Sequence, residues 1–185
     1  MFPELASSPE SLSVHYEDPM SSAKIQHSLA NLLGTINSMH RDTVVLCIGT
    51  DRSTGDALGP LVGSRLRQLG SCGFHVFGTL DEPVHAINLV NVLEYIKSNY
   101  RNPIIIAVDA CLGNSDRVGY INVKPGVLHP GTALQKSLPA VGDLHISGIV
   151  NVGGFLEHLV LQNTRLSLVF RMAEVIAYGL AGFKR

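Results

Sequence analysis

The sequence predicts a doubly wound α/β fold, a three-layer α/β/α sandwich. Short apolar strands rich in β-branched residues alternate with helical segments, which is typical of right-handed α/β units. Two of these strands, 44–48 and 104–108, each lead to a carboxylate, Asp56 and Asp109. Because open α/β sheets bind ligands at the carboxyl ends of their strands, the same pattern predicts a site at that edge.

The composition suits one compact domain, because 45% of the 185 residues are hydrophobic and 16% are charged. A net charge of -1, without a cluster of lysines and arginines, argues against a nucleic-acid partner. No apolar run approaches the ~20 residues of a membrane span, and the N-terminus does not resemble a signal peptide. Three cysteines without CxxC spacing are typical of reduced thiols. We therefore expect a soluble, cytoplasmic protein with no membrane partner.

The first third of the chain predicts an arm, two helices and a strand. Residues 1–20 are rich in proline and serine and predict a flexible arm, which leaves 21–185 as a single α/β domain. Apolar residues at helical spacing predict a helix over 23–37. The run 43–48 predicts the first strand, and the apolar set within 56–69 predicts a helix that packs back on the sheet.

The middle of the chain predicts two further strands around a long helix, then a third, shorter strand. Residues 74–77 alternate as a strand, and 81–99 have helical spacing. The run 104–108 is the most hydrophobic strand and is expected to be central. Residues 117–123 predict a shorter strand at an edge.

The last third predicts a helix over 143–161, a strand over 166–170 and a helix over 172–180, after a segment rich in proline and glycine. Glycines 148, 153 and 154 would allow close backbone packing, either within the fold or against a second subunit. A homo-oligomer is therefore one of two open alternatives.

The loop from Gly49 to Asp56 does not have the pattern of a nucleotide-binding loop. A phosphate-binding loop of the Walker type needs a lysine and a hydroxyl residue where this chain has Asp56 and Ala57. An aspartate at a helix start also competes with phosphate for the free N–H groups. A simpler role for Asp56 alone is an N-cap, which stabilises a helix by ~1 kcal/mol.

Asp109 directly follows five apolar residues, so burial would raise its pKa unless it is paired. A salt bridge to Arg52 or Arg117 is the structural alternative. If the two strands are neighbours, Asp56 and Asp109 converge on one crevice. Two carboxylates there can share a proton and activate water, or bind a divalent cation together with a third ligand.

Histidines supply candidates for that third group. His145 is expected to begin a helix after the long loop and to reach the same edge. His129, in a loop of proline and glycine, and His85, at the start of the second predicted helix, are further candidates. A lone histidine is more often a structural residue, and its position favours His145.

Three segments of the sequence carry a resemblance to known proteins. Ile48–Pro60 (IGTDRSTGDALGP) and Val108–Ala110 (VDA) resemble the germination protease of spore-forming bacteria. The segment Gly78–Leu89 (GTLDEPVHAINL) and the shorter length are more similar to the YyaC sporulation protein family. The resemblance spans roughly Thr43 to Phe170. It implies the fold of the hydrogenase maturation proteases, with a mixed, mostly parallel sheet of five strands.

The resemblance also implies roles for residues. Asp56 and Asp109 match the two motif aspartates that are thought to be catalytic in the germination protease. In the hydrogenase maturation proteases an acidic residue, an aspartate and a histidine bind the nickel-site metal of the partner. These positions fall on Asp56, Asp109 and His145, which we expect as the catalytic residues and as the ligands if a metal binds. The cofactor is thus either none or one divalent metal ion.

Two functions follow from this resemblance. The first is a sporulation-associated endopeptidase that acts on a protein or peptide substrate in the cytoplasm of a spore-forming bacterium, with the forespore as one compartment. The second is a catalytically inactive binding protein with the peptidase fold that acts in spore development. The first loop lacks the G-x-G-N of the maturation proteases, and the chain lacks the extra length of the germination protease. Autoactivation therefore does not carry over from the resemblance.

Overall fold

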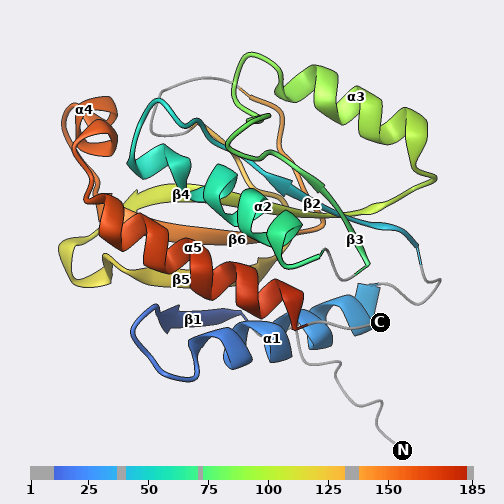
Figure 1. The fold of residues 1–185 in the computed structure, drawn as a ribbon, viewed down its shortest axis with the longest axis horizontal. Helices are drawn as coiled ribbons and strands as arrows, with labels where there is room; N and C mark the ends of the chain where they lie inside the picture. The colour runs from blue at the N-terminus through green and yellow to red at the C-terminus, as the bar shows by residue number, and fades with distance from the viewer. Residues whose placement is uncertain (1–10, 37–40, 71–72, 132–137, 183–185) are drawn as a thin grey trace, which may run out of the picture.

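The computed structural model describes residues 11–36, 41–70, 73–131 and 138–182. In this part of the chain the strands form one mixed sheet of six, in the order β1-β5-β6-β4-β2-β3 (Figure 1). The pairings of β2 with β3, β2 with β4 and β4 with β6 are parallel, whereas β5 pairs antiparallel with β1 and β6. The strands are β1 (Leu12–His15), β2 (Thr43–Cys47), β3 (Phe74–Phe77), β4 (Ile104–Gly113), β5 (Tyr120–Pro125) and β6 (Leu144–Val152).

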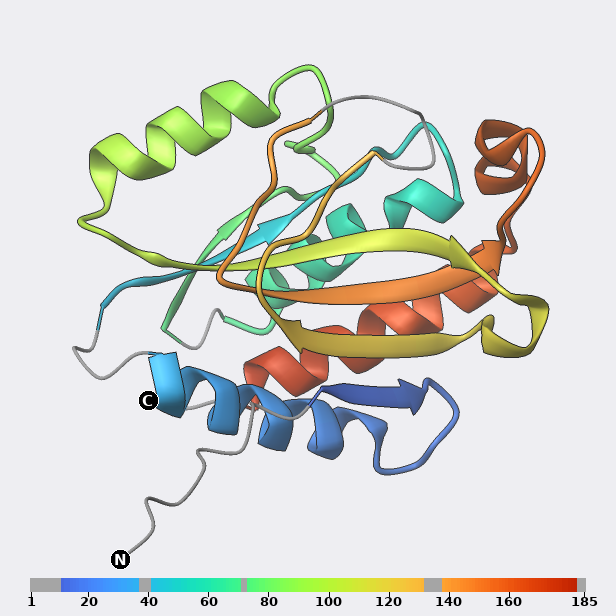
Figure 2. The same cartoon turned by 180° about the vertical axis from the view of Figure 1, so that it is seen from behind.

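Helices cover both faces of this sheet and complete the predicted α/β/α sandwich. One face packs against α1, α2 and α5, and the other against α3 (Figures 1 and 2). A short helix, α4, lies at the carboxyl end of β6. The helices are α1 (Ser21–Ile36), α2 (Leu58–Gln68), α3 (Leu89–Asn99), α4 (Glu157–Gln162) and α5 (Leu166–Ala181). The fold class is confirmed, with six strands in place of five.

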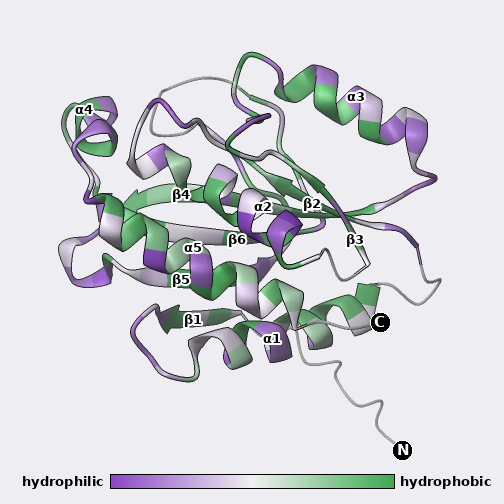
Figure 3. Ribbon diagram, in the orientation of Figure 1, coloured by the Kyte–Doolittle hydropathy of each residue, from purple (hydrophilic) through white to green (hydrophobic). Residues whose placement is uncertain are grey.

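The central strands are buried on both faces, which explains their continuous apolar sequence. In β2, Val45 belongs to the core shared with α1, α2 and α5, whereas its neighbours Val44 and Leu46 face the core under α3. Figure 3 shows hydrophobic colour along β2, whereas the helices mix hydrophobic and hydrophilic residues. A parallel strand between two helical layers requires this two-sided burial.

Two glycines bring α2 unusually close to the sheet. A Cβ at Gly59 would collide with the backbone oxygen of Ile48, and a Cβ at Gly63 with that of Gly78. Only a residue without a side chain fits at either position. This close approach holds the start of α2 against the carboxyl end of β2.

The last third of the chain differs from the prediction. The helix predicted over 143–161 is wrong, because residues 144–152 form β6 and only 157–162 are helical. Leu144, Ile146 and Val150 are buried on alternate positions, which is the period of a strand. The strand predicted over 166–170 is also wrong, because this apolar run is the first part of α5.

The first two thirds of the chain need smaller corrections. Leu12–His15 pairs with β5, so an arm that extends to residue 20 does not fit; residues 1–10 lie outside the described part. The helix predicted over 81–99 begins only at Leu89. The strand predicted over 117–123 is β5, which lies between β1 and β6 and not at an edge. In the described residues, no helix is long and apolar enough to cross a membrane.

Candidate active site

The two aspartates lie together at the carboxyl edge of the sheet. β2 and β4 are parallel neighbours, with Cys47 opposite Val108, and Asp109 is the next residue of β4. The chain that leaves β2 forms a short 3₁₀ helix, η1 (Gly55–Ala57), which carries Asp56. Both carboxylates line one solvent-open cavity of about 190 Å³. The predicted convergence of Asp56 and Asp109 is therefore what the structure shows.

Asp109 is a buried carboxylate that has no cationic partner among the residues that the structure describes. Its side chain is only 7% exposed, and its Oδ1 accepts a hydrogen bond from the N–H of Ala110 at 2.8 Å. Within the described residues it forms no ion pair. Arg117, one of the two expected partners, instead donates to Ser13 and stacks on Tyr120. The salt-bridge alternative is thus wrong for Arg117.

Burial raises the pKa of Asp109 well above its usual value, and the nearby Asp56 carboxylate raises it further. The hydrogen bond from Ala110 opposes this shift. Two carboxylates in one partly desolvated cavity cannot both ionise at low cost. The arrangement therefore favours the protonated form of Asp109.

Asp56 is not an N-cap, because it lies inside η1 and neither η1 nor α2 has a side-chain cap. Burial raises its pKa, while the Thr50 backbone N–H and the His85 ring oppose the shift. Asp56 thus has two groups that stabilise its charge, and Asp109 has one. Of the two carboxyl groups, Asp109 therefore has its pKa raised more strongly.

The histidine at this site is His85 and not His145. Val84 forms a parallel bridge with Ile48, and its carbonyl accepts a hydrogen bond from Gly49 at 2.8 Å. This bridge extends the sheet beyond β2 and brings His85 to the cavity wall. Its Nδ1 accepts a hydrogen bond from the N–H of Ile87 at 3.3 Å, so the neutral ring carries its proton on Nε2.

His145 lies elsewhere because residue 145 is in a strand and not at a helix start. It is opposite Ala107 in the sheet, two positions before the residue that pairs with Asp109. Its Nδ1 is 3.0 Å from the carbonyl oxygen of Gly126, and it does not line the cavity. His129 is exposed, although the next residue, Pro130, forms part of the cavity wall.

Two further side chains of the cavity wall, Cys111 and Glu157, were not predicted from the sequence. Cys111 follows Asp109 by two positions in β4, so the period of a strand could have placed both on one face. Burial raises the pKa of its thiol to about 11, so it is a thiol and not a thiolate at neutral pH. Glu157 could not be predicted, because it depends on where α4 packs.

The side chains do not form a metal site of the expected kind. Across the described ranges, no group of three or more histidine, cysteine, aspartate and glutamate side chains has the geometry to hold a metal ion. Asp56 and Asp109 are close, but the third expected ligand, His145, is held by Gly126. The residues present therefore do not fit a metal held by these three side chains.

The fold and the site define an α/β protein with one buried and one partly buried aspartate at the carboxyl edge of its sheet. The chain belongs to the family described as protein of unknown function (DUF1256), whose model matches residues 13–179. It is 52% identical over 168 residues to the uncharacterized protein YyaC of Bacillus subtilis (strain 168), an alignment that covers 91% of this chain and 81% of that protein. The expected relationship to the YyaC family is thereby confirmed.

A solved structure gives a weaker likeness. The [NiFe] hydrogenase maturation protease HycI from Thermococcus kodakarensis KOD1 is 19% identical, with a TM-score of 0.40 over 80% of this chain and 98% of that chain. A likeness of this size says nothing of the activity of this chain.

Proposed function

We propose that this chain is a peptidase that activates water with Asp56 and Asp109. The observation that carries the proposal is one buried and one partly buried carboxylate, Asp109 and Asp56, on the wall of a cavity open to solvent. Neither forms an ion pair with a described residue. An unpaired buried acid is costly for folding, and such groups concentrate where a reaction needs them. The resemblance of the aspartate motifs to the germination protease supports peptide hydrolysis as the reaction.

In the proposed reaction each cycle begins and ends with Asp109 protonated and Asp56 ionised. Ionised Asp56 takes a proton from water as the water oxygen attacks the peptide carbonyl carbon, while Asp109 gives its proton to the carbonyl oxygen. In the second step Asp56 passes its proton to the leaving nitrogen and the C–N bond breaks. A hydroxyl of the intermediate returns a proton to Asp109, which leaves a carboxylic acid product. His85 stabilises the ionised form of Asp56 at the start of the cycle.

The biological setting of the proposal is sporulation, with a protein or peptide substrate in the cytoplasm of a spore-forming cell. Support comes from the 52% identity to the Bacillus subtilis protein and from the motif resemblance. A binding protein that keeps this cavity but cleaves nothing is the competing function, and the same experiment separates the two.

The test uses purified protein and a library of synthetic peptides, with cleavage followed by mass spectrometry. We expect wild type to cut a subset of peptides, with EDTA present or absent, and Asp56→Asn and Asp109→Asn to cut none. Asp143→Asn is the matched control, because the Asp143 carboxylate only accepts a hydrogen bond from Ile105 at the opposite edge of the sheet. No cleavage by wild type, or equal cleavage by the Asp109→Asn variant, would overturn the proposal.

A further inference from the structure

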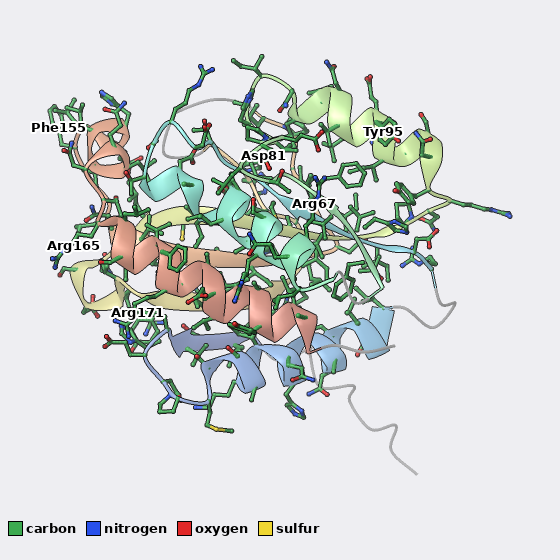
Figure 4. All side chains as sticks on the ribbon, in the orientation of Figure 1. Arg67, Asp81, Tyr95, Phe155, Arg165 and Arg171 are labelled. Carbon is green, nitrogen blue, oxygen red and sulfur yellow. The ribbon has the colours of Figure 1, made fainter. Side chains whose placement is uncertain are left out.

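An exposed apolar surface lies beside the cavity, at the turn that leads into α4. We call it the α4 rim, and it consists of Val152, Phe155, Leu156 and Leu159. Phe155 is 90% exposed, and the other three side chains are 42% to 51% exposed. Figure 4 shows Phe155 at the outer limit of the molecule beside α4. The rim borders a hollow of about 570 Å³, which is more than one aromatic side chain needs.

The rim lies next to the active-site cavity, because Glu157 contacts both. It lines the cavity, and its Oε1 accepts a hydrogen bond at 3.4 Å from the N–H of Gly154, which lines the hollow. Glu157 and Leu161 form part of the cavity wall, whereas Leu156 and Leu159 line the hollow. A ligand that fills the cavity and extends past α4 therefore reaches the apolar surface directly. Clustered exposed apolar side chains next to a catalytic cavity are typical of a binding surface.

The backbone presents the rim outward while α4 stays attached at its other end. Leu156 has a left-handed conformation with φ 56°, which is a strained conformation for leucine. Leu161 is 5% exposed and packs on Gly55, and Thr164 accepts a hydrogen bond from Asn151 at 3.1 Å. The rim is thus held in place by a buried anchor, and the strain is stored at the exposed turn.

A further exposed apolar residue lies beside the cavity on another segment. Ile87 is 87% exposed and directly follows Ala86, which lines the cavity with His85. Apolar surface next to the cavity is therefore not confined to α4.

The charge of the cavity restricts the same ligand. Three carboxylates line it, those of Asp56, Asp109 and Glu157, and His85 is the one basic side chain in the described wall. Glu157 forms no ion pair with any described residue. An acidic side chain close to the scissile bond would be repelled in this partly desolvated space.

We propose that the α4 rim binds an unfolded polypeptide segment that places a large apolar side chain against Phe155 and carries no acidic residue beside the cavity. The inference rests on the proposed function in one respect, since the segment is the substrate only if the aspartate pair cleaves peptides. Binding to the rim is a separate property and can be measured without cleavage.

The experiment measures binding to the Asp109→Asn protein, which keeps the cavity but lacks the acid. The probes are fluorescein-labelled glycine–serine peptides with a central Leu-Phe pair, the same pair flanked by glutamates, or a central Ala-Ala pair. Fluorescence anisotropy should detect the Leu-Phe peptide, with the other two bound about tenfold more weakly or not at all. Equal affinity for the three peptides would overturn the proposal.

Substitutions in the same Asp109→Asn background locate the binding surface. Phe155→Ser and Leu159→Ser should each weaken binding of the Leu-Phe peptide by about tenfold, which is the effect of removing one partly buried apolar contact. Phe170→Ser is the matched control, because Phe170 is an exposed phenylalanine on α5 that does not line the hollow. Unchanged thermal unfolding shows that each variant is folded, and unchanged binding in both rim variants contradicts the proposal.

The two proposals fail in different ways. If the Leu-Phe peptide binds through Phe155 but wild-type protein cleaves no peptide, the rim inference stands and the peptidase proposal fails. If wild type cleaves peptides but Phe155→Ser binds them unchanged, the peptidase proposal stands and the rim inference fails.

Discussion

Aspartates lie at both edges of the sheet, but the two edges give them different surroundings. At the amino edge, Asp143 accepts a hydrogen bond from the N–H of Ile105 at 2.8 Å, and Asp42 lies 3.6 Å from His75 in an exposed pair. At the carboxyl edge, Asp56 and Asp109 are at least half buried, lie close enough for Asp56 to raise the pKa of Asp109, and form no ion pair with a described residue. The carboxylates at the amino edge interact with a backbone N–H or a histidine and have a structural role. Burial of the carboxylates at the carboxyl edge lowers the stability of the fold but leaves them available for chemistry.

The largest effect that this contrast predicts is on catalysis by the pair. Asp56→Asn and Asp109→Asn should each lower the cleavage rate by about 10³-fold, since general acid–base groups contribute on the order of 10²–10⁴-fold. The double variant should lose no more than either single one, because the two carboxylates act as one unit. Single-turnover rates on the best library peptide measure both effects. Additive losses would contradict a shared proton.

The second prediction concerns the packing that forms the carboxyl edge. Gly63→Ala should destabilise the protein by about 3 kcal/mol, because the new Cβ would collide with the backbone oxygen of Gly78. Gly34→Ala in α1 is the matched control, since nothing lies within 4 Å of its new Cβ. That variant should gain about 0.5–1 kcal/mol from helix propensity. Urea denaturation measures both, and a Gly63→Ala protein as stable as wild type would show that α2 can move away from β3.

The sequence predicted the part of the site that depends on strands with continuous apolar runs. β2 and β4 are such runs, and a carboxylate after each one indicated the edge where Asp56 and Asp109 meet. The prediction was wrong for β6, because glycines and an apolar run allowed a helix as well as a strand. That single error moved His145 to the wrong end of the sheet.

The sequence could have placed His85 at the site only if the pairing of Ile48, directly after β2, with Val84 had been known. The segment 81–88 was assigned to a helix, whereas its residue Val84 pairs with Ile48 and continues the sheet. Glu157 and Phe155 were beyond prediction for another reason. Their place beside the cavity depends on how α4 packs against η1, which no local pattern encodes.

The third prediction distinguishes the two histidines. His85→Gln should lower the cleavage rate by about tenfold, because the ring that stabilises ionised Asp56 is lost. His145→Gln should leave the rate unchanged, since that ring contacts Gly126 outside the cavity. Initial rates measured across pH give a second readout, because Asp56 should ionise at a higher pH in the His85→Gln protein. A larger loss in the His145→Gln protein would reverse the assignment.

The finest test of the contrast between the edges is the pH dependence of stability. The native pKa of Asp109 is raised, so between the unfolded value of about 3.9 and the native value the folded protein binds more protons than the unfolded chain. Stability should therefore fall as pH rises through that window, and Asp109→Asn should reduce the fall.

The effect of pH on stability has the opposite sign for the surface carboxylate Asp18, because its hydrogen bond with Lys24 lowers its pKa. The stabilising contribution of Asp18 is lost as pH falls, so Asp18→Asn should be closest to wild type in acid. Urea midpoints measured from about pH 2 upward cover both windows. Parallel curves for wild type and Asp109→Asn would show that Asp109 is ionised at no cost.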